Sequence, residues 1–146
     1  MTDLPTTASF DARADDLADL FGAAADGLER TEMLIDFGRE LPPFPDAFRS
    51  DAFRVRGCQA QVWIAPEFAG GGALVLHGDS DALVTRGLVA ILVTLLSGLP
   101  ASAIADADLG VLDRIGVAEH LSPTRRNGLA AMVARIRAYA AAASPS

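Results

Sequence analysis

Apolar residues recur three or four positions apart over residues 11–40, as they do on the buried face of an amphipathic helix. Gly22 and Gly27 interrupt this pattern, and glycine weakens a helix interior, so the pattern also allows two shorter helices. The prolines of residues 42–45 end the helical region, because proline lacks the backbone donor and clashes with the preceding turn. Residues 1–10, which are mainly polar, are predicted to form a loose tail.

A small β region is predicted in the middle of the chain. Residues 53–56, 61–65 and 73–78 are rich in β-branched, aromatic and aliphatic side chains and have the length of short strands. Gly57 with the cysteine that follows it, and the glycines of residues 69–72, are typical of turns between strands. Connections this short cannot hold a parallel crossover, so the pattern indicates an antiparallel meander.

Residues 81–97 are almost entirely apolar and predict a core helix that is buried on most of its surface. Asp79 and Asp81 stand just before it, where carboxylates cap a helix and complement the positive end of its dipole. A pair of catalytic carboxylates is the less ordinary interpretation of these two residues. The sequence of residues 98–100, Gly-Leu-Pro, ends the helix.

Three more helical segments are predicted after this core helix. Residues 101–105 and 109–115 are short, whereas residues 123–143 carry an apolar stripe along their length. Ser122 supplies an N-cap for this last helix, and a proline occupies its first position. Residues 144–146 are predicted to fray.

Composition narrows the classes of function. With 146 residues, of which 51% are hydrophobic, the chain is expected to form one domain over its whole length. Its net charge of −7 repels phosphate backbones and anionic lipids, so neither a nucleic acid nor a membrane is expected as a partner. All 12 basic residues are arginines, which excludes a Schiff-base lysine and a standard phosphate-binding loop.

The chain has one cysteine and therefore cannot form an internal disulfide. No secretory signal is recognisable at its start, so the expected location is a reducing cytoplasm. The most apolar stretch, residues 87–96, has roughly half of the ~20 residues that a membrane span needs.

Cys58 is the first candidate for chemistry. It follows Gly57, which permits a tight turn, and Arg56, whose guanidinium would favour the nucleophilic thiolate. Free cysteine is also among the residues most often buried as small hydrophobes. From these residues alone, a reactive thiol and a structural thiol are about equally well supported.

Two further types of cysteine site are disfavoured. His77 or His120 could pair with Cys58 in a cysteine hydrolase, but no segment has the character of an oxyanion hole or a binding cleft. A zinc site formed by these three residues would lack the short-spaced ligand pair of known zinc sites. No metal is therefore expected.

Arg125 and Arg126 stand in the first turn of the predicted last helix, where cations oppose the helix dipole. A solvated pair is the simplest interpretation. A contact for an acidic surface of a partner protein is the functional one.

Four segments of the chain carry recognisable motifs: residues 38–42, 54–63, 78–87 and 120–129. The most specific of these motifs is Gly-Cys-Gln-Ala-Gln-Val-Trp, at residues 57–63. Together the four segments resemble the SufE family, the sulfur-acceptor proteins of iron–sulfur cluster assembly.

The resemblance implies an α+β fold similar to that of the scaffold protein IscU, with a three-stranded antiparallel sheet and N-terminal and C-terminal helices packed against it. It implies that Cys58 lies on a loop, is tucked into an apolar pocket when idle, and accepts a persulfide sulfur. Arg56, Gly57 and Gln59 are the supporting residues beside it, and Asp81 is expected to cap the helix under the loop.

The resemblance also implies partners. A SufS-type cysteine desulfurase, which carries its own pyridoxal phosphate, would donate the sulfur and be stimulated, with Arg125 and Arg126 as its contacts. A scaffold complex of the SufBCD type would receive the sulfur. The chain itself would need no cofactor and would be a monomer or a homodimer.

Three alternatives stay open at this point. A CsdE-like protein would pass the sulfur to another acceptor. A non-covalent regulator would stimulate the desulfurase with Cys58 only structural, and a cysteine hydrolase ranks last.

Overall fold

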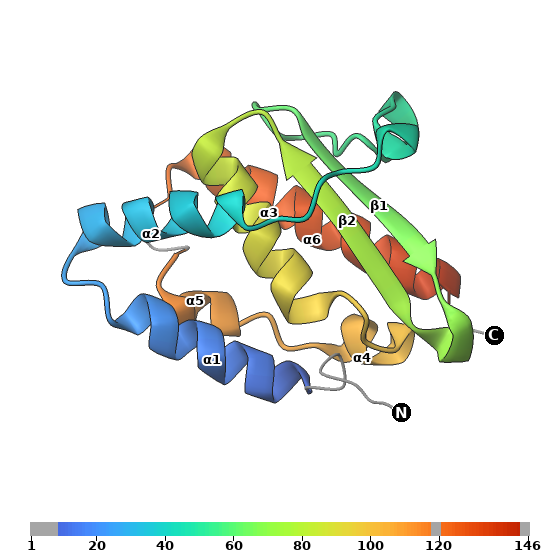
Figure 1. Cartoon of the computed structure of the whole chain (residues 1–146), viewed down its shortest axis with the longest axis horizontal. Coiled ribbons are helices and arrows are strands. Elements are labelled where there is room, and N and C mark those ends of the chain that lie inside the picture. Colours follow the sequence, from blue (N-terminus) through green and yellow to red (C-terminus); the bar gives the residue numbers. More distant parts are fainter. Residues whose placement is uncertain (1–8, 118–120, 144–146) are drawn as a thin grey trace.

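The chain is described here by a computed structural model that covers residues 9–117 and 121–143 (Figure 1). Of the tail predicted over residues 1–10, residues 1–8 lie outside the described residues, and the predicted frayed end at residues 144–146 lies outside them too. Ser9 and Phe10 are not part of a loose tail, because Ser9 caps the first helix and Phe10 begins it. The helices are α1 (Phe10–Gly22), α2 (Gly27–Arg39), α3 (Leu83–Leu96), α4 (Ala101–Asp106), α5 (Val111–Ile115) and α6 (Pro123–Ala143), and the strands are β1 (Val62–Phe68) and β2 (Leu74–Ser80).

Two separate helices form the N-terminal region, which is the second of the two arrangements that the sequence allows. Gly27 does not interrupt a helix but begins α2. Asp26 caps this helix by accepting a hydrogen bond from the backbone N–H of Glu29 at 2.9 Å. The carboxylate of Glu29 reaches back to the N–H of Ala25, also at 2.9 Å, so two donors at the helix start are satisfied by reciprocal side chains.

The sheet is an antiparallel hairpin, as the short connection predicts. Strand β1 pairs with β2 over its full length, from Val62 opposite Ser80 to Phe68 opposite Leu74. The connecting turn contains Gly71 and Gly72, whose φ angles are 76° and 81°. Residues with side chains rarely adopt such angles, so the glycines of the predicted turn are what closes the hairpin.

The prediction of a third strand over residues 53–56 is wrong. Within the described residues the sheet has two strands, and Phe53 instead ends a short 3₁₀ helix. Arg54 forms only an isolated bridge with Trp63. The carbonyl oxygen of Arg54 accepts a hydrogen bond from the Arg135 guanidinium of α6 at 3.1 Å. The 3₁₀ helix before Arg54 and the Arg135 guanidinium bound to its carbonyl oxygen leave no run of extended backbone that could pair with β1 as a third strand.

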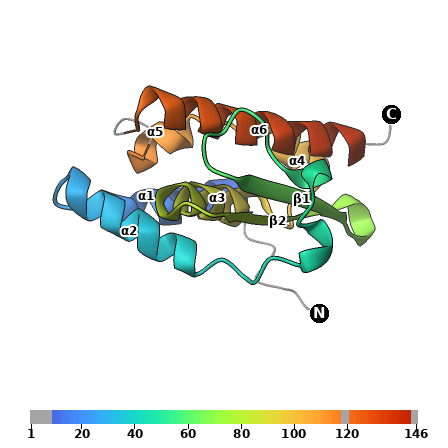
Figure 2. The ribbon, with the colours of Figure 1, turned by 90° about the horizontal axis from the view of Figure 1, so that it is seen from above.

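Helix α3 lies beside β2 in a central layer, with α6 on one side of this layer and α2 on the other (Figure 2). As predicted, α3 is the core helix, and most of its side chains are buried. Gly87 lets α2 approach closely, because a Cβ there would stand 2.3 Å from the carbonyl oxygen of Leu34. None of the helices in the described ranges is both long and apolar enough to cross a membrane.

The last three helices form where the sequence predicts them. Ser122 caps α6, since its hydroxyl oxygen accepts a hydrogen bond from the N–H of Arg125 at 3.2 Å. Helix α6 crosses β1, and the Tyr139 hydroxyl donates a hydrogen bond to the carbonyl oxygen of Ile64 at 2.7 Å. This contact fixes the helix over the strand that follows the cysteine.

Candidate functional site

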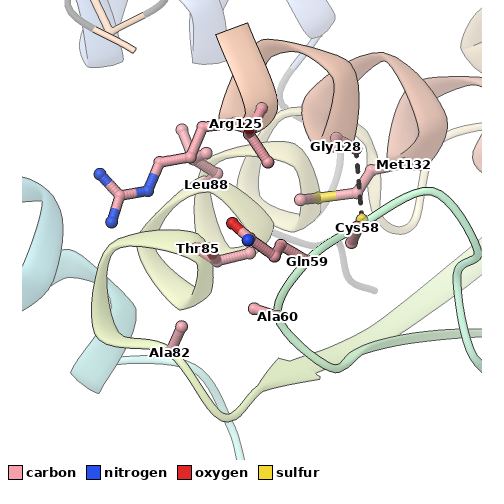
Figure 3. A pocket seen from close by; sticks show the side chains of 10 residues that line it. Cys58, Gln59, Ala60, Ala82, Thr85, Leu88, Arg125, Gly128 and Met132 are labelled. Carbon is pink, nitrogen blue, oxygen red and sulfur yellow. Dashed lines mark hydrogen bonds between the residues drawn. The ribbon is translucent and has the colours of Figure 1, made fainter. Parts of the chain in front are cut away.

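Cys58 lies in a loop that leads into β1. The N–H of Val55 donates a hydrogen bond to the carbonyl oxygen of Val62 at 2.8 Å and closes the loop at its base. Gly57 has a φ of 90°, a conformation that side-chain-bearing residues rarely adopt. The predicted Gly-Cys turn is therefore present, and it aims the cysteine side chain toward α6 (Figure 3).

The thiol of Cys58 is half-buried against α6. Its Sγ lies 3.6 Å from the carbonyl oxygen of Gly128, within the range of a weak thiol hydrogen bond. A Cβ at position 128 would stand 3.4 Å from Sγ, so the helix carries no side chain where the sulfur rests. The loop and the helix thus meet at a cysteine and a glycine.

A cavity of about 210 Å³ opens beside Cys58 between the loop, α3 and α6 (Figure 3). Its wall combines apolar side chains with polar ones, and the described residues that form it include neither an acidic residue nor a histidine. The lining residues are Cys58, Gln59, Ala60, Ala82, Thr85, Leu88, Thr124, Arg125, Gly128 and Met132.

Burial raises the pKa of the Cys58 thiol above its ordinary value, because a thiolate is poorly solvated there. The expectation that Arg56 promotes the thiolate is not supported, since Arg56 is exposed and burial is the cause of the shift. Arg125 lines the cavity, but its guanidinium points away from Cys58 (Figure 3). The resting thiol is therefore protonated at neutral pH.

Asp81 acts on the cysteine loop and not on the helix. The prediction that it caps α3 is wrong, because the N-cap is Ala82 and no side chain caps this helix. The Asp81 carboxylate instead accepts a hydrogen bond from the N–H of Gln61 at 3.0 Å. The N–H of Asp81 donates to the carbonyl oxygen of Gln61 at 3.2 Å. These two bonds hold the end of the loop that contains Cys58.

Asp79 is the buried centre of an ion-pair network, so the capping role predicted for it is also wrong. Its two carboxylate oxygens bind the guanidinium groups of Arg49, at 2.8 Å, and Arg86, at 2.9 Å. Arg49 also stacks on the rings of Phe44 and Trp63. The network ties the segment before the cysteine loop to β2 and α3.

The structure separates Arg125 from Arg126. Arg125 lines the Cys58 cavity, as described above. Arg126 lies beside a different, apolar groove on the other face of α6, next to Leu112 and Leu129. Of the two predicted partner contacts, only Arg125 lines the cavity that holds the thiol.

The histidines give no support to a hydrolase or a zinc site. His77 faces Glu67, with 2.7 Å between Nε2 and Oε1, and it is not part of the Cys58 cavity. His120 lies outside the described residues. Within the ranges that are described, no three side chains of His, Cys, Asp or Glu gather as metal ligands would.

Several residues of the site were not identified from the sequence. Thr85, Leu88 and Met132 have the periodicity of ordinary core positions, and nothing in the sequence distinguishes those that border a cavity. Gly128 does carry a signal, because a glycine inside a helix often marks a close approach. Its partner in that approach, Cys58, becomes known only from the fold.

Comparison with known proteins agrees with the motifs. The SufE family model, described as an Fe-S metabolism associated domain, matches residues 15–140. A SufE-like protein of Rhizobium meliloti (strain 1021) is 37% identical over 90% of this chain and 97% of its own length. A SufE-like protein of Rhizobium etli is 39% identical over 88% of this chain and 89% of its own length. A solved structure of a hypothetical protein from Thermus thermophilus has the same fold, with a TM-score of 0.73 at 22% identity over 90% of this chain and 95% of that one.

Proposed function

The chain belongs to the SufE family of Fe-S metabolism associated domains, and we propose that within this metabolism it is a sulfur acceptor. In this proposal a SufS-type cysteine desulfurase passes sulfur to Cys58. The pyridoxal phosphate belongs to the desulfurase, which agrees with the absence of lysine from this chain. A scaffold complex of the SufBCD type is the proposed recipient of the sulfur.

The transfer is a thiol exchange without net oxidation or reduction. The Cys58 thiol loses its proton, and the thiolate attacks the outer sulfur of the persulfide on the desulfurase cysteine. The sulfur–sulfur bond of that persulfide breaks as the new bond to Sγ forms. The desulfurase thiolate leaves and takes up a proton, and Cys58 holds the sulfur as a persulfide.

One observation carries the proposal: the lone thiol of the chain stands at a cavity large enough for a second sulfur atom. The 210 Å³ beside Cys58 exceeds what the bound sulfur needs. Leu88 and Met132 form an apolar part of the cavity wall, which would shield the persulfide from reductants dissolved in the solvent. Among the described residues, the wall also holds no carboxylate that would repel the anionic persulfide.

The resting loop is not yet arranged for attack. Its thiol is half-buried and protonated, and the loop is held by Val55 at its base and by Asp81 at its end. We propose that the docked desulfurase draws the loop outward, so that solvation or a partner group lowers the pKa of Cys58. Arg125, at the cavity wall, is the proposed contact for the desulfurase.

Intact-mass measurement tests the proposal directly. The chain is incubated with a SufS-type cysteine desulfurase and cysteine, and its mass is recorded before and after reduction. We expect the wild type to gain the mass of one sulfur atom, to lose it on reduction, and the Cys58→Ser variant to gain nothing. A wild type that neither gains mass nor stimulates the desulfurase would overturn the proposal.

The alternatives predict other results in the same experiment. A non-covalent regulator would stimulate cysteine turnover without gaining mass, and its Cys58→Ser variant would stimulate equally well. A CsdE-like carrier would gain the sulfur but deliver it to an acceptor other than an iron–sulfur scaffold. Transfer of labelled sulfur from the loaded chain to a SufBCD-type complex distinguishes this case.

A further inference from the structure

A second, smaller cavity lies next to the Cys58 cavity, and Arg125 lines both. It has a volume of about 40 Å³ and is bounded by α2, the start of α3, and the chain around α5 and the start of α6. Its lining residues are Gly27, Arg30, Thr31, Leu34, Val84, Gly116, Val117, Leu121 and Arg125.

Arg30 brings a second guanidinium to this cavity, and no described residue compensates its charge. Its Nε is buried and has no hydrogen-bond partner in the described part of the chain. The group lies against Gly116, where a Cβ would stand 3.2 Å from Nε, so the glycine makes room for it. Among the described residues, neither the Arg30 nor the Arg125 guanidinium takes part in a hydrogen bond or an ion pair.

Two acidic residues near Arg30, at the start of α2, accept hydrogen bonds from backbone N–H groups. Asp26 accepts the N–H of Glu29, and Glu29 accepts the N–H of Ala25. No acidic residue of the described ranges lines either cavity, although the chain carries a net charge of −7. Arg30 is half-buried and lacks the carboxylate that would stabilise a partly desolvated guanidinium, and the exposed Arg125 lines the same cavity. The two arginines could therefore bind a carboxylate from a partner protein.

We propose that Arg30 and Arg125 together bind a carboxylate side chain of the cysteine desulfurase when it docks over Cys58. This inference rests on the proposed function and adds α2 to the docking surface. A volume of 40 Å³ fits a small group, since a water molecule needs about 10–15 Å³ by the same measure. Because Arg125 is shared by the two cavities, one docked protein can reach the thiol and this site at once.

The test compares the affinity of three charge variants for a SufS-type cysteine desulfurase, measured by calorimetry. We expect Arg30→Gln to raise Kd about fivefold and Arg30→Glu to raise it about tenfold or more, because a reversed charge repels the incoming carboxylate. Arg39→Glu is the matched control, with the same change in net charge at the far end of α2, where Arg39 is exposed and paired with Asp36. It should change Kd less than about twofold.

Two further measurements separate the possible outcomes. At saturating desulfurase, Arg30→Glu should still gain one sulfur, because Arg30 acts in docking and not in transfer. Added salt should narrow the difference in Kd between Arg30→Glu and wild type, since it screens the charges. Equal Kd values for wild type and Arg30→Glu would overturn this inference alone. A wild type that neither binds the desulfurase nor gains sulfur would overturn the proposed function and this inference with it.

Discussion

The Sγ atom of Cys58 lies 3.6 Å from the carbonyl oxygen of Gly128, so the reactive loop rests directly on the backbone of α6. This approach depends on a missing side chain. A Cβ at position 128 would be 3.4 Å from Sγ, an ordinary van der Waals contact, and anything larger would compete with the sulfur for space. The half-buried resting position of the thiol therefore depends on the contact between two residues that are distant in sequence.

Substitutions at Gly128 should separate helix stability from thiol burial. Gly128→Ala fits beside the thiol and removes a helix-weakening glycine, so the free energy of unfolding should rise by about 0.5–1 kcal/mol. Gly128→Val adds methyl groups beyond the Cβ and should push the Cys58 loop outward. Alkylation by iodoacetamide, followed by mass spectrometry, should then be faster for the valine variant than for the alanine variant. Equal alkylation rates would show that Gly128 does not set the depth of the thiol.

Asp81 should control the opening of the cysteine loop. Asp81→Ala removes the acceptor for the N–H of Gln61, an exposed bond of roughly 1 kcal/mol, so hydrogen exchange at Gln61 should accelerate about fivefold. Asp108→Ala is the matched control, because Asp108 accepts the N–H of Gly110 at 2.9 Å in a turn that lines neither cavity beside Arg125. This control should leave exchange at Gln61 unchanged. Protection of Gln61 that survives in Asp81→Ala would refute the role of the carboxylate.

The raised pKa of Cys58 makes stability depend on pH in a predictable direction. The folded state holds the thiol proton more tightly than the unfolded state, because burial penalises the thiolate. The resulting stability is fully present below the unfolded pKa and is lost as pH rises through the folded pKa.

Urea unfolding of wild type and Cys58→Ser, at neutral pH and at about pH 10, checks this direction. The wild type should lose more stability than the variant over this range. Tyr139, whose pKa is also raised by burial, is present in both proteins, so its contribution cancels in the comparison. A Cys58→Ser variant that loses as much stability as the wild type would argue against a buried neutral thiol.

Features that depend on local chemistry could be predicted from the sequence. Helix periodicity, the glycine turn between β1 and β2, and the cap at Ser122 all rest on neighbours within a few residues. The turn at Gly57, with its positive φ, is another case. The family resemblance pointed to Cys58 in the same way, because the motif around it is continuous in sequence.

Features that depend on distant partners could not be predicted. Asp79 and Asp81 have the pattern of helix caps, yet Asp79 binds Arg49 and Arg86, and Asp81 binds the loop of Cys58. The strand predicted over residues 53–56 failed for a similar reason, since Arg135 of α6 binds the carbonyl oxygen of Arg54 within it and that of Ala52 just before it. In each case a long-range contact outweighed a local propensity.

The Asp79 network should contribute measurably to stability. Asp79→Asn keeps the shape of the side chain but leaves the two guanidinium groups uncompensated. Because both are more than one-third exposed, water replaces part of the lost interaction, and we expect a loss of about 2 kcal/mol in the free energy of unfolding. Asp36→Asn breaks an exposed ion pair with Arg39 and should cost about 0.5 kcal/mol or less. Similar losses for the two variants would mean that the network adds nothing beyond a surface pair.

Arg125 and Arg126 are neighbours in sequence but line different faces of α6, and this makes them matched probes of where the desulfurase docks. Charge reversal at either position changes the net charge equally, so long-range electrostatic steering should be affected to the same extent. Arg125→Glu places a carboxylate at the Cys58 cavity and should raise the Kd for the desulfurase about tenfold, with thermal unfolding unchanged because the side chain is exposed. Arg126→Glu should change Kd less than about threefold. If the two reversals weaken binding equally, the desulfurase senses the overall charge of α6 and not a site beside the thiol.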